Sequence, residues 1–307
     1  MSIENRSLLQ MSPGMRIALF LAVSGVSMVV GALVSFSIIA GYFHVGFADI
    51  QRVLLSPEHS SAALFSNALA SFIAFLVPSI AVAYFTAGPV LKNMGFNIPN
   101  TPKLIFSVIL LSIAGLLLSG ALASVTEWIP VPTSFKNWAN ELEANYKKAM
   151  MAMLQMHSIG GLLINLLAVA LIPAMVEELY FRGALQSNLK AWSSNYWIAI
   201  IVTSIVFSAF HFSYFGFLSR MGLGMVLGFI FEYTKSIWLC ILMHFLNNGI
   251  AIIAIYRAKG NAIEADKIMD AKFPLAWVVV ALVLVVILLN KIKKEANYVN
   301  LEKDIHE

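Results

Sequence analysis

Residues 159–183 read IGGLLINLLAVALIPAMVEELYFRG. The uncharged part, 159–176, approaches the roughly 20 apolar residues that a helix needs to cross the hydrocarbon core of a bilayer. Glu177 and Glu178 follow directly, and Arg182 comes four residues after Glu178. A charged side chain at the centre of a membrane helix costs about 2.5 to 3.5 kcal/mol on insertion scales, so such residues normally face one another or a wet cavity. The stretch therefore predicts a membrane helix that carries a polar site.

The composition of the whole chain agrees with this interpretation. Of its 307 residues 60% are hydrophobic and only 12% are charged, and the mean hydropathy is +0.82. A soluble domain carries roughly twice that share of charged residues. The net charge of +4, without a long run of Lys or Arg, excludes a nucleic-acid partner, and the lone Cys240 provides neither an internal disulfide nor a Cys-based metal site. We expect an integral membrane protein in contact with the lipid bilayer.

Eight uncharged apolar runs are candidates for membrane spans. They are 17–43, 62–85, 104–125, 159–176, 197–217, 221–233, 237–256 and 273–289. The sixth is short and rich in glycine, and the first is too long for a signal-peptide core of about 7 to 15 residues, so we expect it to be retained. The pattern predicts an all-α, polytopic membrane helix bundle with about eight transmembrane helices, and without a repeat or linker the economical interpretation is one transmembrane domain, 1–307.

The distribution of basic residues predicts the orientation of the chain. Eight crossings place both termini on one side, which then holds 11 of the 20 Lys and Arg residues, against 9 on the other side. By the positive-inside rule this small excess favours cytoplasmic termini, and we expect the plasma (inner) membrane.

In the stretch 126–157, Trp138, Leu142, Tyr146 and Met150 recur at helical spacing beside charged residues. They predict a helix that lies at the membrane interface; a substrate gate is the functional alternative.

The two adjacent glutamates are predicted to have different roles. Arg182 follows Glu178 by four residues, so the two side chains share one helix face and can pair. Glu177 is turned about 100° away from Glu178 and remains free to point into the bundle. Pro173 cannot donate to the carbonyl of Val169 and should kink the helix just before the glutamates.

Two further pairs at helical spacing fall inside the later apolar runs. His211 follows Phe207 by four residues, and Asn248 follows His244 by four. If these groups converge with Glu177 in a wet cavity, they contain a base for water, donors for an oxyanion and a proton for a leaving amine, as amide hydrolysis requires. One difficulty remains, because at about 1.5 Å per residue the predicted spans place His211 some 10 Å from the depth of Glu177 and His244.

This set of residues resembles a known family. The order Glu177-Glu178-x-x-x-Arg182, Phe207-x-x-x-His211 and His244-x-x-x-Asn248 looks like the three signature motifs of the CAAX-protease and bacteriocin-processing (CPBP, or Abi) intramembrane proteases, which include the type II CAAX prenyl endopeptidases. The likeness covers a catalytic core of about 159–253, a third of the chain. It implies an eight-helix membrane fold and an endopeptidase activity.

The resemblance also implies a role for each matching residue. Glu177 corresponds to the catalytic carboxylate, and His211 helps to activate water. His244 and Asn248 form the oxyanion hole. Glu178 and Arg182 shape the site, and Phe207 is a packing residue.

Metal dependence divides the interpretation into two mechanisms. Glu177, His211 and His244 are also a ligand set of the kind that binds catalytic zinc, with one position left for water. The resemblance favours a glutamate-dependent reaction without a cofactor, and zinc remains the alternative.

The sequence thus predicts an intramembrane endopeptidase that hydrolyses a peptide bond of a membrane-associated peptide or protein substrate with activated water. A catalytically silent family member that acts as a membrane scaffold or immunity factor is one alternative. A proton-coupled transporter that uses the same carboxylate and histidines is another, although paired, inverted halves with broken helices are not apparent. Neither the substrate nor the oligomeric state can be read from the sequence.

Overall fold

The computed structural model describes residues 11–86, 88–98, 101–258 and 261–306 of the chain. Within these ranges the chain is built from helices, and the one β pairing is an isolated bridge between Phe96 and Ser236. The predicted all-α, polytopic membrane helix bundle is therefore confirmed.

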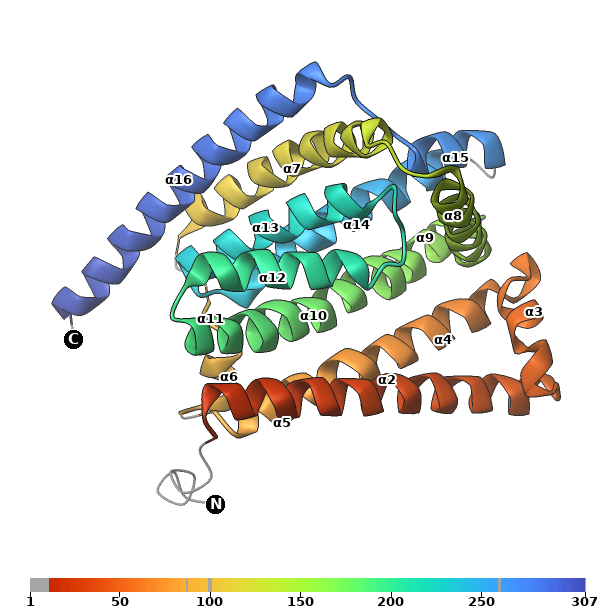
Figure 1. The fold of residues 1–307 in the computed structure, drawn as a ribbon, viewed down its shortest axis with the longest axis horizontal. Coiled ribbons are helices and arrows are strands. Elements are labelled where there is room, and N and C mark those ends of the chain that lie inside the picture. The colour runs from red at the N-terminus through yellow and green to blue at the C-terminus, as the bar shows by residue number, and fades with distance from the viewer. Residues whose placement is uncertain (1–10, 87, 99–100, 259–260, 307) are drawn as a thin grey trace.

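The long helices run side by side, and α2 begins at the same end of the bundle at which α16 ends (Figure 1). The elements that form the long rods are α2 Pro13–Phe43, α4 Ser60–Ser71 with α5 Val77–Tyr84, α7 Pro102–Trp128, α9 Ile159–Asn165 with α10 Ile172–Glu178 and α11 Ser187–Ser193, α12 Tyr196–Ala209, α13 Phe217–Thr234, α14 Ile237–Arg257 and α16 Ala276–His306. Shorter helices are α3 Ile50–Leu54 and α6 Val90–Asn93, with 3-10 turns η2 Phe47–Asp49 and η3 Pro57–His59.

Six of the described helical segments are long and apolar enough to cross a membrane, which makes the chain an integral membrane protein. These segments are Pro13–Phe43, Pro57–Tyr84, Pro102–Trp128, Ile159–Ser193, Ile237–Arg257 and Ala276–Asn297. The other two predicted spans correspond to α12, a shorter apolar helix, and α13, whose 18 residues include Arg220 and Glu232.

Two of the predicted boundaries were wrong. The fourth span was expected to end at Val176, but the helical segment continues to Ser193, so the glutamates lie inside it. The fifth was expected to reach Phe217, but α12 ends at Ala209 and His211 lies in the following turn.

Three π-helical segments interrupt the rods. They are η4 Phe72–Leu76, η5 Leu166–Leu171 and η6 Leu179–Gln186. Pro173 lies just after η5, so the irregularity is close to the predicted kink, and η6 starts directly after Glu178. Single π turns often occur at functional sites because they redirect side chains that a regular helix would place elsewhere.

The outer and inner faces of the bundle differ as a bilayer requires. Large apolar side chains such as Leu21 and Val26 on α2 and Val279 on α16 are exposed. Inside, α7 packs against α13, α14 and α16. Gly224 of α13 permits the close approach of α12, since a Cβ atom there would lie 3.1 Å from Cβ of Ser204.

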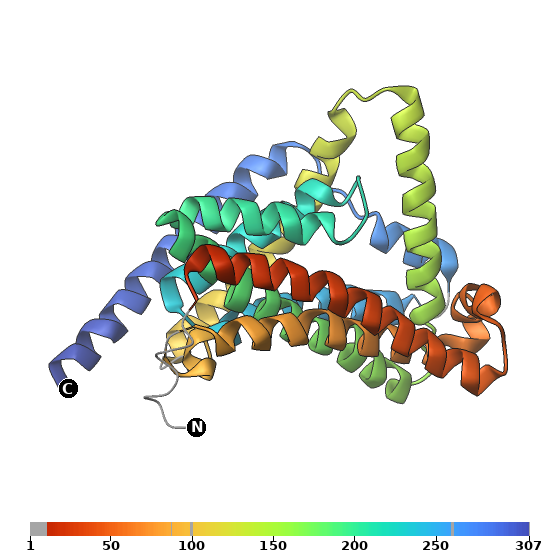
Figure 2. The same ribbon diagram turned by 60° about the horizontal axis from the view of Figure 1, so that its bottom comes forward.

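The expected interfacial helix is α8, Thr133–Met153. It stands across the direction of the long rods (Figure 2), which is the orientation of a helix that lies in the plane of the membrane surface. The short helix α15, Ala262–Met269, lies at the same end of the bundle. Lys147 of α8 joins the two, with ion pairs of 3.1 Å to Asp266 and 2.5 Å to Asp270.

Candidate active site

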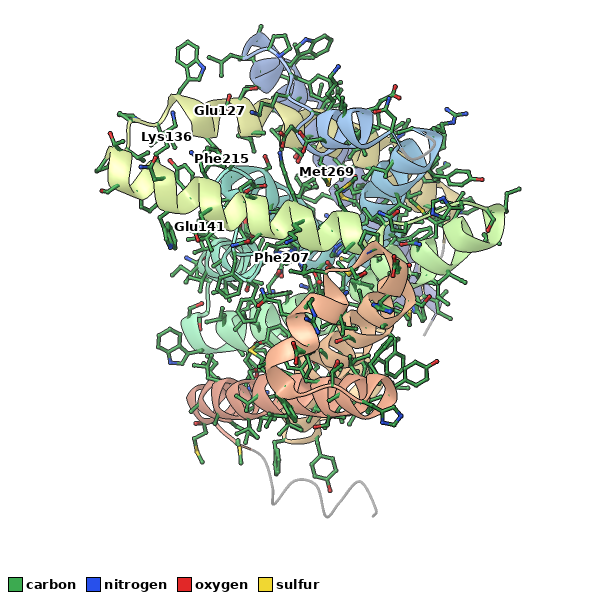
Figure 3. All side chains as sticks on the ribbon, turned by 90° about the vertical axis from the view of Figure 1, so that its right-hand side faces the viewer. Glu127, Lys136, Glu141, Phe207, Phe215 and Met269 are labelled. Carbon is green, nitrogen blue, oxygen red and sulfur yellow. The ribbon has the colours of Figure 1, made fainter. Side chains whose placement is uncertain are left out.

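A cavity of about 600 Å³ opens among α10, α14, the α12–α13 turn, α13 and α8. Figure 3 views the molecule from the end where α8 crosses it, with the cavity-lining residues Phe207, Phe215 and Met269 labelled. The side chains predicted to act in catalysis all line this cavity: Glu177, His211, His244 and Asn248. The structure therefore brings together residues from three separate motifs, and their chemical roles remain predictions.

Glu178 and Arg182 form the ion pair that their spacing predicts. Arg182 Nη1 donates to Glu178 Oε1 over 2.9 Å, and both side chains are fully buried. Nη2 of Arg182 also donates to the carbonyl of Gly224 on α13, over 3.1 Å. The pair thus fixes the glutamate helix against α13 and adds no net charge to the bundle.

His244 is a third member of this network, which the sequence did not reveal. Its Nδ1 atom lies 2.7 Å from Oε1 of Glu178. Because an ionised carboxylate only accepts hydrogen bonds, the Nδ1–H group donates, and Nε2 is the ring atom on the opposite side. Nε2 lies 3.9 Å from Oε2 of Glu177, too long for a hydrogen bond and suitable for a bridging water.

Glu177 differs from its neighbour in its surroundings. Its Oε2 atom is buried and accepts no hydrogen bond from the described part of the chain, although the residue lines the cavity. In Glu178, Oε2 likewise has no partner among the described residues, but Oε1 accepts from both Arg182 and His244. Adjacent carboxylates thus have separate environments, as the angle of about 100° between successive residues of a helix requires.

His211 owes its position to the end of α12. In a continuing α-helix its backbone N–H would bond to the carbonyl of Phe207. Here the backbone N–H bonds instead to Ser208, and the ring Nδ1 lies 2.9 Å from the Phe207 carbonyl oxygen. A carbonyl only accepts, so Nδ1 carries the proton and the Nε2 atom of a neutral ring is an acceptor.

Phe207 is the packing residue that the resemblance implied. Its ring lies 4.9 Å below the guanidinium carbon of Arg182 and makes edge contacts with His211 and His244, at centroid distances of 5.0 and 5.9 Å. An aromatic face attracts a cation and excludes water. One ring therefore holds the buried arginine and both histidines in place.

Other residues of the cavity wall had no role in the sequence-based prediction. Arg220 from α13, Asn247 beside Asn248, and Glu143 and Tyr146 from α8 all line the cavity. The available signal was weak: Arg220 is a single charge between two apolar runs, and α8 is distant from the motifs in sequence.

The donor set does not form a metal site. Among the described residues no group of three or more His, Cys, Asp or Glu side chains is close enough to hold a metal ion. Glu177, His211 and His244, the alternative ligands for zinc, share the cavity wall but are not gathered around one point. We therefore derive no reaction step through a metal.

Comparison with known proteins supports the family resemblance over the same segment. Residues 159–250 match the family described as Type II CAAX prenyl endopeptidase Rce1-like, and this range includes every motif residue from Glu177 to Asn248. The chain thus contains a segment similar to a peptidase family. A protein of Bacillus subtilis (strain 168), described as "Uncharacterized protein YpbD", is 26% identical over 90 residues. That alignment covers 28% of this chain and 43% of the relative, less than half of its length. No solved structure matches the chain.

Proposed function

We propose that the protein is an intramembrane endopeptidase in which Glu177 activates water to hydrolyse a peptide bond of a membrane-associated substrate. One observation carries the proposal: Glu177 lines the cavity and its buried Oε2 atom has no hydrogen-bond partner among the described residues, whereas Glu178 is held by Arg182 and His244 through Oε1 and is not among the residues of the cavity wall. Glu177 can therefore meet water in the cavity and accept a proton at Oε2 without breaking a bond to the described part of the chain.

In the first step Glu177 removes a proton from a water molecule, and the water oxygen attacks the peptide carbonyl carbon. A water bonded to both Oε2 of Glu177 and Nε2 of His244, which are 3.9 Å apart, would lie to one side of the line that joins them. His211 has its Nδ1–H engaged with the chain, so its Nε2 atom accepts a second hydrogen bond and orients the water. The C–O bond forms as the carbonyl π pair moves onto oxygen.

The resulting oxyanion requires donors, which we assign to Asn248 and His244. The side-chain NH₂ of Asn248 donates without any change in charge. His244 donates from Nε2 only while both ring nitrogens carry protons, and Glu178 supplies the negative charge beside such an imidazolium. Donors fixed in advance stabilise the charge that develops in the transition state, which is often the largest single contribution to catalysis.

The second step transfers the proton held by Glu177 to the peptide nitrogen. The C–N bond then breaks, its electron pair stays with nitrogen, and the carbonyl forms again. The products are a carboxylic acid and an amine, and Glu177 returns to its ionised state. Glu178 and Arg182 do not touch the substrate in this scheme; they position His244 and the glutamate helix.

We propose that this reaction needs no metal or other cofactor. The proposal is supported by the positions of Glu177, His211 and His244, which do not form a group that could hold a metal ion among the described residues. The remaining parts of the proposal are that the site serves a peptide or protein substrate at the membrane, and that both termini face the cytoplasm from the plasma (inner) membrane. Support for the orientation comes from the excess of basic residues on the terminal side.

The experiment is a comparison of membrane peptides from cells that express the wild type or Glu177→Gln. We expect a set of cleaved termini that only the wild type produces, measured by mass spectrometry of labelled peptide ends. Glu143→Gln is the matched control, because Glu143 is another glutamate of the cavity wall, already bonded to Ser213 over 2.7 Å. Identical termini from wild type and Glu177→Gln would favour the silent scaffold or immunity factor.

A further inference from the structure

The cations around the cavity differ in whether the chain neutralises them. Lys147 pairs with Asp266 and Asp270, and Lys272 pairs with Glu127 over 2.5 Å. Burial lowers the pKa of Lys147, but its hydrogen bonds to Asp270 and Asp266 outweigh this effect and raise the pKa overall. Arg220 also lines the cavity, and it makes no ion pair within the described residues.

Arg220 is nevertheless held in one place. Its guanidinium carbon lies 5.2 Å from the centroid of the Tyr146 ring, in a cation–π contact with α8. Its Nη1 atom is buried and has no acceptor in the described part of the chain. Gly216 provides the space, since a Cβ atom at that position would overlap Nη1. The nearby carboxylate of Glu143 accepts from Ser213 instead.

A partly buried guanidinium that forms no direct ion pair is unfavourable, because it loses hydration and one of its N–H groups has no acceptor. The ring of Tyr146 covers one face of the Arg220 guanidinium, so the N–H groups in the guanidinium plane remain available as donors. Their geometry matches the two oxygens of a carboxylate. A ligand carboxylate would therefore supply the ion pair and the acceptor that the described residues do not.

We propose that Arg220 binds a carboxylate of the substrate, and that the enzyme selects peptides with an acidic group only a few residues from the scissile bond. The inference rests on the proposed function, since Arg220 and Glu177 line the same cavity. The carboxylate is either the α-carboxylate at a chain end or the side chain of Asp or Glu. Arg220 is then a specificity residue, and it takes no part in the bond-breaking steps.

The test uses purified protein in lipid nanodiscs and a tryptic digest of membrane proteins, offered either untreated or methyl-esterified at its carboxyl groups. With the wild type we expect esterification to lower cleavage roughly 10- to 100-fold, the usual effect of losing a charged hydrogen-bond partner. Arg220→Gln should cleave both digests at the same low rate, and Arg220→Lys should keep part of the preference. Lys147→Gln, at a cation the chain already neutralises, should behave as the wild type.

The positions of the cuts identify the source of the carboxylate. Cuts at a constant distance from the peptide end indicate the α-carboxylate, and cuts at a constant distance from Asp or Glu indicate the side chain; either result supports the inference. Gly216→Ala, which pushes against the guanidinium without removing it, should weaken the same preference. A wild type without a preference, or an Arg220→Gln variant that keeps it, overturns the inference.

A binding measurement separates this inference from the proposed function. If the wild type cleaves neither digest, the endopeptidase proposal fails, and retention of the same peptides by nanodiscs that carry Glu177→Gln decides the role of Arg220. Preferential retention of the untreated peptides that disappears in the Glu177→Gln, Arg220→Gln double variant supports carboxylate binding. Equal retention of both digests overturns it. Thermal unfolding of each variant shows whether a lost preference comes with an intact fold.

Discussion

The buried pair of Glu178 and Arg182 should show strong energetic coupling. Glu178→Ala removes the acceptor of both Arg182 and His244 and leaves a fully buried guanidinium with only the Gly224 carbonyl. We expect a loss of about 5 kcal/mol, the upper end for breaking a buried ion pair. Arg182→Ala should cost about 3 kcal/mol, because Glu178 keeps its hydrogen bond to His244.

The double variant removes both charges and should cost less than the two single changes together. We expect about 5 to 6 kcal/mol, which corresponds to a coupling energy of about 2 to 3 kcal/mol between the two side chains. The free energy of unfolding of detergent-purified protein, followed by tryptophan fluorescence during titration with a denaturing detergent, measures all four corners of the cycle.

The control for this cycle is the ion pair of Lys272 and Glu127, whose side chains are 37% and 46% exposed. Exposed pairs are screened by water and usually couple by less than about 1 kcal/mol. A coupling energy between Glu178 and Arg182 no larger than that of the control would refute the reasoning, since it would show that the buried pair does not act as a unit.

The remaining predictions concern the reacting groups and the helix packing that positions them. Glu177→Gln should lower turnover by about 10² to 10⁴-fold, the usual contribution of a general base, and leave the unfolding temperature near that of the wild type, because Oε2 of Glu177 accepts no hydrogen bond from the described residues. Near-normal turnover would remove this residue from the mechanism. Asn248→Asp should lower turnover by about 10² to 10³-fold without rescue by added zinc, because the change replaces a hydrogen-bond donor with an acceptor. If the wild type loses activity with a chelator and regains it with stoichiometric zinc, the protein is instead a metalloenzyme. Gly224→Ala should destabilise the fold by about 1 to 3 kcal/mol in the same unfolding assay, because a Cβ atom would lie 3.1 Å from Cβ of Ser204. The control Gly25→Ala should be neutral or stabilising, because a Cβ atom there meets nothing within 4 Å. Equal effects of the two changes would mean that α13 moves freely against α12.

Local spacing was enough to predict the parts of the site that depend on one helix. The interval of four residues between Glu178 and Arg182 predicts their pairing, and the angle between successive residues separates Glu177 from Glu178. Both features follow from helix geometry alone, so no knowledge of the tertiary fold is needed. The apolar runs likewise predicted the bundle, because only a helix satisfies its own backbone in lipid.

The bond between His244 and Glu178 could not be predicted in this way. The two residues are 66 positions apart, and the pairing of Glu178 with Arg182 already accounted for both of their charges. Which face of α14 turns toward the glutamate helix depends on packing around α7 and α13, and a single sequence does not specify it. Arg220 escaped notice for a related reason: the cation–π contact with Tyr146 joins α13 to an interfacial helix far away in sequence.

The early end of α12 explains a discrepancy in depth that the sequence alone could not resolve. At about 1.5 Å per residue the 14 residues of α12 span about 21 Å, so the helix is about 9 Å shorter than a hydrocarbon core of about 30 Å. The predicted span extended to Phe217 and therefore carried His211 outward, away from Glu177. In the structure the chain turns after Ala209, and His211 lies beside Phe207, on the wall of the same cavity as Glu177. The cavity lies at this end of α12, and α8 crosses the same end of the bundle (Figure 3). The short helix thus accounts for the position of His211 on the wall of a cavity that also contains Glu177, inside an apolar bundle.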